Sequence, residues 1–270
     1  MNYHSDEWIM ERVREHYNEA IEYFQEDRIV GIYYQGSGNY NLDFPGSDVD
    51  TKLIVTPTLD DIIFNRKPVS TTHIRANDEH IDFKDIRLMF GTFRKCNLNF
   101  TEILFTKYKI INPLYEEQWN RIVSNNELIA RYNEVAAVKT MKGIAMEKFH
   151  ALEHRYPSKI DIIDKYGFDG KQLHHLFRVE EYLKRFINGE PYANCLISRQ
   201  AEYLKNVKTH GYYTLEQARV LAQESLDRVC MMADKFREEH TEESDKEVDL
   251  LLDDVQRNIM LIAIKKEIGD

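Results

Sequence analysis

The chain has 270 residues, of which 43% are hydrophobic, enough for a sizeable core in one or two domains. It carries 46 Asp and Glu residues against 36 Lys and Arg, a net charge of −10, which argues against sequence-independent binding to nucleic-acid phosphates. Cys96, Cys195 and Cys230 stand far apart, which argues against a disulfide framework and favours a reducing compartment. No stretch reaches the roughly 18 apolar residues of a membrane span, so we expect a cytoplasmic protein with no membrane partner.

The first part of the chain predicts one helix followed by a small sheet. Apolar residues recur at helical spacing from about Ser5 to Gln25, and Ser5 is placed to cap that helix. Short β-rich runs then follow, with a hairpin connection between the last two and a helix after them. The expected strands are residues 28–34, 48–55, 69–74 and 80–84, and the expected helix is 85–96.

After Pro113 the apolar pattern becomes helical almost throughout. The expected helices lie near 115–130, 133–155, 170–188, 214–239 and 246–267, and capping boxes start those at Asp169 and Thr214. The sequence therefore predicts an α+β fold, with a mixed sheet and flanking helices in residues 1–112 and a helical domain in residues 113–270.

The most informative stretch pairs a glycine-containing turn with spaced aspartates. Gly36-Ser37 follows the first strand, Asp48-Val49-Asp50 comes ten residues later, and Asp82 stands between two apolar residues of a later strand. Alternate side chains of a strand point to one face, so Asp48 and Asp50 project together, about 6.5–7 Å apart along the backbone. Asp82 would face outward from the same sheet, and the three carboxylates could converge.

Converging carboxylates repel one another unless a cation lies between them. Mg²⁺ prefers oxygen ligands and is commonly held by one or two carboxylates together with substrate phosphates. A glycine after a strand lets the backbone approach a phosphate, and Ser37 adds a hydroxyl and an N–H group. The pattern favours a metal-nucleotide site; the alternative is that Gly36 and Ser37 form an ordinary loop and the aspartates cap helices or turns.

These residues resemble the DNA polymerase β-like nucleotidyltransferases, whose hallmark is a hydrophobic strand, Gly-Ser, about ten residues, Asp-x-Asp and a third acid on a later strand. Residues 36–50 look like the bacterial and phage nucleotidyltransferases found beside RNA-repair genes, and the likeness extends to residues 99–105 and 170–178. It covers roughly residues 28–235. The glycine that follows the tyrosine in that family is Asn41 here, a residue type that tolerates positive φ.

Two residues close to the aspartates are further candidates for nucleotide contact. Lys52 follows Asp50 by two positions and should point to the same side, where it could contact phosphate or neutralise the acids. Tyr40 lies between Ser37 and the aspartates, where its ring could pack on a base or on its own loop.

Three candidates lie in the helical half. Lys142 falls on an apolar helix face, where it could reach a phosphate or cover apolar surface with its stem, and its neighbour Gly143 suggests a close packing contact. His174 and Arg178 share a helix face at i,i+4 spacing. Resemblance to the family's His-and-Arg helix implies a nucleotide contact, and the alternative is a solvated face.

The resemblance implies transfer of a nucleoside monophosphate from a nucleoside triphosphate to a hydroxyl, with release of pyrophosphate. Asp48, Asp50 and Asp82 would hold two Mg²⁺ ions, with Mn²⁺ as the alternative metal, and the helical domain would close the nucleotide cleft. The acceptor is left open among an RNA end, a protein hydroxyl and a small molecule. The rival hypotheses are a non-catalytic nucleotide sensor or interaction module on the same fold and a helical scaffold with structural aspartates.

Overall fold

The computed structural model of the chain describes residues 3–209 and 211–269, and they divide into two units. Unit 1 consists of the chain up to Asn39, Asp43–Asn133 and the chain from Ser244 onward. Unit 2 consists of Tyr40–Leu42 and Glu134–Glu243. Unit 1 contains a sheet with helices, and unit 2 is helical, which confirms the predicted fold class.

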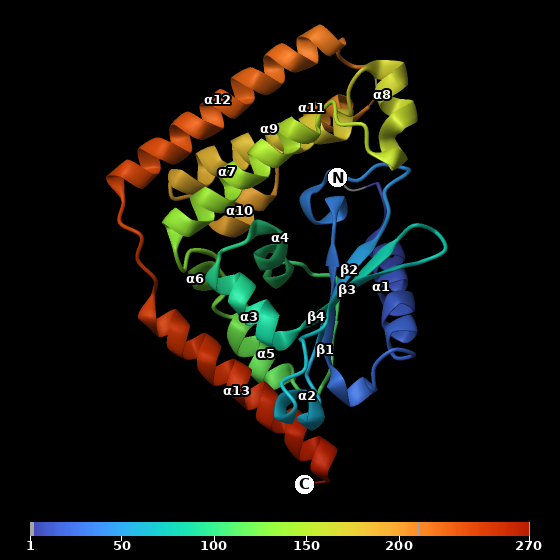
Figure 1. The fold of residues 1–270 in the computed structure, drawn as a ribbon, viewed down its shortest axis with the longest axis vertical. Coiled ribbons are helices and arrows are strands. Elements are labelled where there is room, and N and C mark those ends of the chain that lie inside the picture. Colours follow the sequence, from blue (N-terminus) through green and yellow to red (C-terminus); the bar gives the residue numbers. More distant parts are fainter. Residues whose placement is uncertain (1–2, 210, 270) are drawn as a thin grey trace. The chain divides into compact units, whose positions relative to one another are not determined.

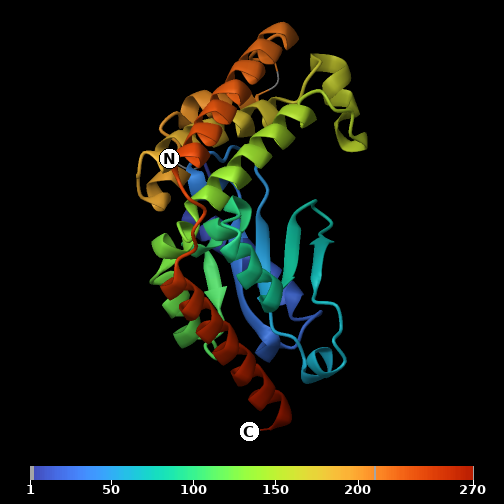
Figure 2. The same cartoon turned by 60° about the vertical axis from the view of Figure 1, so that its left-hand side comes forward.

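Unit 1 is built on a five-stranded mixed sheet in the order β3-β4-β2-β1-β5. The strands are β1 (Ile29–Gln35), β2 (Asp50–Val55), β3 (Ser70–Ile74), β4 (His80–Asp85) and β5 (Lys109–Ile111). Strands β2 and β4 run parallel, and the other neighbouring pairs are antiparallel. Figure 2 shows the β3–β4 hairpin at one edge of the sheet. The four predicted strands are all present, and β5 is an addition to them.

Helix α1 (Asp6–Ala20) covers one face of the sheet, which we call the α1 face (Figure 1). Its first turn is capped as predicted, because the Ser5 hydroxyl accepts a hydrogen bond from Trp8 N at 3.2 Å. Ile9 and Val13 of this helix are buried in one cluster with apolar side chains of β1, β2 and β4. The α1 face is therefore the hydrophobic side of the sheet, and its burial attaches α1.

The opposite face of the sheet carries most of the other helices of unit 1 (Figure 1). Besides α1, the helices of unit 1 are α2 (Leu59–Ile63), α3 (Ile86–Arg94), α4 (Leu98–Thr101), α5 (Glu116–Val123), α6 (Asn126–Ala130) and α13 (Lys246–Ile268), with 3-10 turns at Glu26–Arg28, Ser37–Tyr40 and Glu102–Leu104. The ring of Trp119 from α5 lies 5.2 Å from that of Tyr33 in β1, centroid to centroid. Both side chains are fully buried, so this contact is part of a second core.

The sheet unit extends beyond the predicted boundary at residue 112. Trp119 packs on β1, and α13 contacts α3 and α5, so both segments belong to unit 1 although they follow residue 112. The predicted helix 115–130 is two helices, α5 and α6, separated at Ser124 and Asn125. Amphipathic periodicity identifies a helix but does not say which core its apolar side joins.

Unit 2 is a helical unit between Asn133 and Ser244. Its helices are α7 (Glu134–Ala151), α8 (Ile160–Tyr166), α9 (Gly170–Ile187), α10 (Tyr192–Leu196), α11 (Ala201–Lys208) and α12 (Leu215–Glu239), with a 3-10 turn at Pro157–Lys159. Helix α9 contacts α7, α10, α11 and α12. Thr214 and Gln217 form the predicted capping box at the start of α12, whereas Asp169 caps α9 by accepting from Lys171 N at 2.9 Å.

Among residues 3–209 and 211–269, none of the helices combines the length and the apolar character that a bilayer-crossing segment needs.

A charged cluster joins α1 to the β3–β4 hairpin on the α1 face. Its centre is the Glu79 carboxylate, only 6% exposed, which accepts hydrogen bonds from Arg12, from His16 Nε2 at 2.9 Å and from Arg75 Nη1 at 2.9 Å. Burial by itself would raise the pKa of Glu79, but the hydrogen bonds from His16 and Arg12 outweigh it, and the net pKa lies well below the usual value. Glu79 is therefore an anion in the folded chain.

Replacing Glu79 by Gln should lower the free energy of unfolding at neutral pH. A carboxyl whose pKa is depressed by folding contributes stability above its unfolded pKa of about 4.3, and that contribution is lost as the pH falls. The difference between wild type and Glu79→Gln should therefore shrink steadily below about pH 4. Urea unfolding from pH 7 to pH 3 measures it, with the exposed α1 residue Glu11→Gln as the control. A difference that is independent of pH would contradict the assignment.

Candidate active site

The turn after β1 has a backbone that requires glycine. Gly36 has a φ of +145°, and a Cβ atom built there would lie 3.0 Å from the hydroxyl oxygen of Tyr34. The same hydroxyl accepts a hydrogen bond from Gly38 N at 2.9 Å. The Ser37 hydroxyl donates to Ser47 Oγ at 3.3 Å, which ties the turn to the loop that leads to Asp48.

Asp50 is the first residue of β2 and faces away from α1. It is in register with Gln35, the last residue of β1. Its Oδ1 atom accepts hydrogen bonds from His80 N at 2.9 Å and from His80 Nδ1 at 3.0 Å. Burial raises the pKa of Asp50, and the charge of the exposed Asp48 raises it further. The negative charge of Asp48 therefore acts on Asp50, and the predicted convergence of the three carboxylates stays a prediction.

Asp82 lies on the neighbouring parallel strand, in register with Lys52. Its carboxylate accepts hydrogen bonds from Thr72 Oγ1 at 2.6 Å, from Gln35 Nε2 at 3.1 Å and from Lys52 Nζ at 3.3 Å. Burial opposes ionisation, but the Thr72 bond and the Lys52 charge outweigh it, and the pKa of Asp82 is lowered. Asp82 is thus an anion with a cationic partner.

Lys52 is almost fully buried between the acids and an aromatic ring. Its Nζ atom lies 4.2 Å from the centroid of the Phe100 ring, and Lys84 Nζ lies 5.1 Å from the same centroid. Burial lowers the pKa of Lys52, and the charge of Asp82 acts against that shift. Of the two predicted roles, the structure supports neutralisation of an acid, because Lys52 pairs with Asp82.

Asp50 and Asp82 project from one face of the sheet and remain accessible. Strand alternation places Gln35, Asp50, Lys52 and Asp82 on the face opposite α1. The side chains of Asp50 and Asp82 are 28% and 31% exposed, so solvent or a ligand can reach both. These four residues, together with Asp48, Thr72, His80 and the Gly36-Ser37 turn, are what we call the acidic site.

The oxygen donors of the acidic site fit a hard divalent cation in chemistry. Burial and then the neighbouring charge of Asp48 raise the pKa of Asp50, and a cation beside the two carboxylates would oppose both effects. Asp82, by contrast, already has Lys52 as a cationic partner. In the part of the chain that the structure describes, no group of three or more His, Cys, Asp or Glu side chains is close enough to hold a metal ion. The two-metal assignment of Asp48, Asp50 and Asp82 stays a prediction.

Tyr40 and Arg178 come together within unit 2. The Arg178 guanidinium carbon lies 3.6 Å from the centroid of the Tyr40 ring, a stacked cation–π contact. Asn41 adopts a φ of +60°, as expected for the residue that replaces the family's glycine. The Tyr40 ring therefore packs on an arginine of α9, and the predicted nucleotide contacts of both residues stay predictions.

His174 is a buried residue of α9, which differs from the solvated face that the sequence left open. Its Nδ1 atom lies 2.8 Å from Leu204 O and donates to it. Burial lowers the pKa of His174 to about 4, so the ring is neutral at neutral pH. With Nδ1 protonated, Nε2 is an acceptor and does not suit a phosphate oxygen. This geometry favours a structural role for His174, and its predicted nucleotide contact stays a prediction.

Lys142 has a partner inside unit 2. Its Nζ atom lies 2.7 Å from both carboxylate oxygens of Asp234 in α12, a partner that the sequence does not predict. The close packing contact expected at Gly143 is absent. Apart from the two adjacent residues and the nearby backbone of α7, no atom of the described residues lies within 4 Å of a Cβ atom built there. Lys142 therefore connects α7 to α12, and its predicted phosphate contact stays a prediction.

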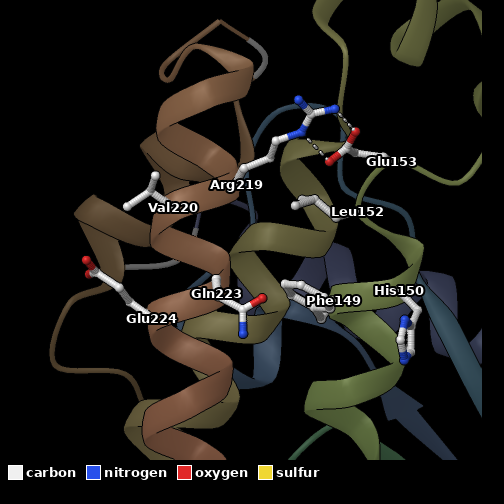
Figure 3. A pocket seen from close by; sticks show the side chains of 8 residues that line it. All are labelled: Phe149, His150, Leu152, Glu153, Arg219, Val220, Gln223 and Glu224. Carbon is white, nitrogen blue, oxygen red and sulfur yellow. Dashed lines mark hydrogen bonds and ion pairs between the residues drawn. The ribbon is translucent and has the colours of Figure 1, made fainter.

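A groove of about 660 Å³ lies between α7 and α12 in unit 2 (Figure 3). Its floor includes Phe149 and Leu152, and a bidentate ion pair between Arg219 and Glu153 lies at one end. None of the predicted site residues lines this groove.

No protein-family model matches the sequence, and no curated protein matches it significantly. One solved structure, of a nucleotidyltransferase-like protein from Exiguobacterium sibiricum 255-15, is similar over 94% of this chain and 87% of that chain, with 14% sequence identity and a TM-score of 0.31. A similarity of that size carries no argument about this chain, so the acidic site has to be judged on its own geometry.

Three residues of the acidic site are missing from the sequence-based prediction: Gln35, Thr72 and His80. Two of them had a signal in the sequence. His80 stands two positions before Asp82, so strand alternation puts the two on one face, and Gln35 directly precedes Gly36. Thr72 could not be found in this way, because its contact with Asp82 depends on the register of the β3–β4 hairpin.

Substituting Gly36 by Ala should destabilise unit 1 by about 1–3 kcal/mol, because an L-residue is strained at that φ and its Cβ would press on Tyr34. Gly46→Ala is the matched control, since a Cβ there meets only an ordinary contact at 3.5 Å. The free energy of unfolding in urea measures both. Equal stability of the two variants would contradict the requirement for glycine at residue 36.

Substituting Asp48 by Asn should lower the pKa of Asp50, because it removes the neighbouring negative charge and leaves the burial of Asp50 unchanged. Carboxyl-carbon NMR titration of Asp50 measures the shift. The exposed Asp60→Asn in α2 serves as the control and should leave the titration of Asp50 as it is in wild type. An unchanged pKa of Asp50 in Asp48→Asn would show that the two carboxylates do not interact.

Proposed function

We propose that the chain is a metal-dependent nucleotidyltransferase that moves a nucleoside monophosphate from a nucleoside triphosphate to a hydroxyl acceptor. The observation that carries the proposal is that Asp50 and Asp82 project from the same face of the sheet. Asp48 lies near Asp50, and the Gly36-Ser37 turn follows the end of the adjoining strand β1. The resemblance of the same residues to the polymerase β-like pattern supports it.

The proposed reaction is a displacement at the α-phosphorus. The acceptor oxygen forms a bond to that phosphorus, the bond to the pyrophosphate oxygen breaks, and the hydroxyl proton passes to solvent or a nearby base. Mg²⁺ at the site would neutralise phosphate charge and make the acceptor oxygen more nucleophilic. Asp48 and Asp50 would hold the metal, and the Gly36-Ser37 turn would present N–H and hydroxyl groups to the phosphate oxygens.

Asp82 has a separate part in this proposal. To bind a metal, its carboxylate would exchange the Lys52 ammonium, which is 3.3 Å away, for the cation. Lys52 would then be a buried cation beside the site, suited to a phosphate oxygen. Because the parallel register fixes Lys52 level with Asp82, the exchange needs a change of side-chain partner and no movement of the strands.

A nucleotide sensor without turnover is the second candidate function. The specific observation in its favour is that Asp82 is satisfied by Lys52, Thr72 and Gln35. If Asp82 keeps these three partners when nucleotide is bound, Asp48 and Asp50 could still bind a metal-nucleotide. No carboxylate would then be left to hold the metal ion that activates the attacking oxygen. Turnover, and not binding alone, distinguishes the two functions.

Magnesium with a nucleoside triphosphate should raise the melting temperature of wild type, because a ligand that binds only the native state stabilises it. The double variant Asp48→Asn/Asp50→Asn should lose that shift. Asp82→Asn should keep most nucleotide binding and lose pyrophosphate release, since its role lies in the chemical step. Thermal unfolding and a pyrophosphate assay with an RNA, protein and small-molecule acceptor panel measure these effects.

Asp60→Asn is the control for the loss of one carboxylate and should behave as wild type in both assays. A full thermal shift in the double variant would contradict metal binding by Asp48 and Asp50. Nucleotide binding by wild type with no pyrophosphate release across the acceptor panel would favour the sensor.

A further inference from the structure

The two residues that flank Asp50 are both held from the α1 face by the Glu79 cluster. Val49 N donates to Glu79 Oε1 at 3.2 Å. Thr51 Oγ1 lies 2.9 Å from Nδ1 of His16, and Nε2 of the same ring donates to Glu79 Oε2 at 2.9 Å. The Glu79 carboxylate therefore binds the backbone N–H of Val49 directly. It reaches the Thr51 hydroxyl through the His16 ring.

The direction of these bonds determines where the aspartates point. Val49 is buried in the cluster that packs on α1, and Thr51 is fully buried on the same face. Side chains alternate along a strand, so holding Thr51 against α1 directs Asp50 to the opposite face, and holding Val49 fixes the backbone between Asp48 and Asp50. The acidic site and the Glu79 cluster, which is Glu79 with Arg12, His16 and Arg75, thus lie on opposite faces of the same backbone segment.

The segment around Asp48 needs such a tie. Asp48 and Val49 precede the first residue of β2, so the strand ladder does not hold them. Repulsion between Asp48 and Asp50 acts on the same segment and favours separation of the two carboxylates. The bond from Val49 N to Glu79 opposes that separation, because it fixes the backbone between them.

Glu79 is itself held rigidly. Its carboxylate also accepts from Arg75 Nη1 and from Arg12, and its own N–H donates to Asn77 Oδ1 at 3.3 Å. These partners come from α1 and from the β3–β4 hairpin, so the acceptor that meets Val49 is fixed by two elements at once. A carboxylate with that many donors and almost no exposure has little freedom to turn away.

We infer that Glu79 is a positioning residue of the acidic site, which sets the Asp48–Asp50 pair for a divalent cation through the Val49 N–H group and, by way of His16, through Thr51. The inference rests on the proposed function, because it concerns the same metal pair. Partners of this kind, which do not touch the metal, commonly change metal affinity by about ten- to a hundredfold when removed. Glu79 faces α1, so it acts on the metal only through the backbone.

The test is Mn²⁺ binding to the full chain, measured by electron paramagnetic resonance below the melting temperature of every variant. Glu79→Ala should bind Mn²⁺ about tenfold more weakly than wild type. Glu79→Gln should lie between them, because its amide oxygen can still accept from Val49 N. Amide hydrogen exchange at Val49 should be faster in Glu79→Ala, a local readout that a general loss of stability would not single out.

Glu19→Gln is the matched control. Glu19 belongs to the same charged surface of α1, and its carboxylate accepts from His73 Nε2 at 2.6 Å and Arg75 Nε at 2.7 Å, contacts that do not involve Val49. It should bind Mn²⁺ as wild type does. Wild-type affinity in Glu79→Ala, or an equal loss in Glu19→Gln, would overturn the inference and leave the proposed function standing. No Mn²⁺ binding by wild type would overturn both.

Discussion

The parallel pairing of β2 with β4 is the constraint on which the acidic site depends. It sets Lys52 level with Asp82 and leaves Asp50 beside His80. Because side chains alternate along a strand, a shift of one residue would turn Asp82 into the hydrophobic cluster under α1 and remove it from the face that carries Asp50. Apolar burial on the α1 face makes that shift costly, so the core that attaches α1 also maintains the site.

The acidic site contains two electrostatic situations side by side. At one end, burial and the charge of Asp48 raise the pKa of Asp50, so this carboxylate pair is electrostatically unfavourable without a cation. At the other end, the Thr72 hydroxyl, the Lys52 ammonium and the Gln35 amide lower the pKa of Asp82, so its carboxylate is already stabilised as an anion. In the proposed function, a cation would therefore bind beside Asp48 and Asp50 first. On the α1 face of the same segment, Glu79 forms ion pairs with Arg12 and Arg75. These partners offset its negative charge, which therefore adds little to the repulsion between Asp48 and Asp50.

Much of the fold was predictable because it depends on local patterns. The capping side chain of Ser5, the capping box at Thr214 and the strand alternation around Asp50 and Asp82 act over a few residues, and the structure confirms them. The boundaries between the two units, at residues 133–134 and 243–244, could not be found in this way, and the predicted boundary at residue 112 lies inside unit 1. Trp119 is periodic in the sequence like any helical apolar residue, and only its contact with Tyr33 shows that α5 belongs to the sheet unit.

The sequence by itself determined the α+β class and the Gly36-Ser37 turn, because backbone conformation and strand period are properties of neighbouring residues. The pairing of β2 with β4 put Asp50 and Asp82 on one face of the sheet. The tertiary structure decided the partners. It paired Lys52 with Asp82 and Lys142 with Asp234, buried His174 against α11, and brought Glu79 to the backbone of Val49. A charged or polar side chain can meet many partners, and which one it meets depends on how distant elements pack and not on its place in the chain.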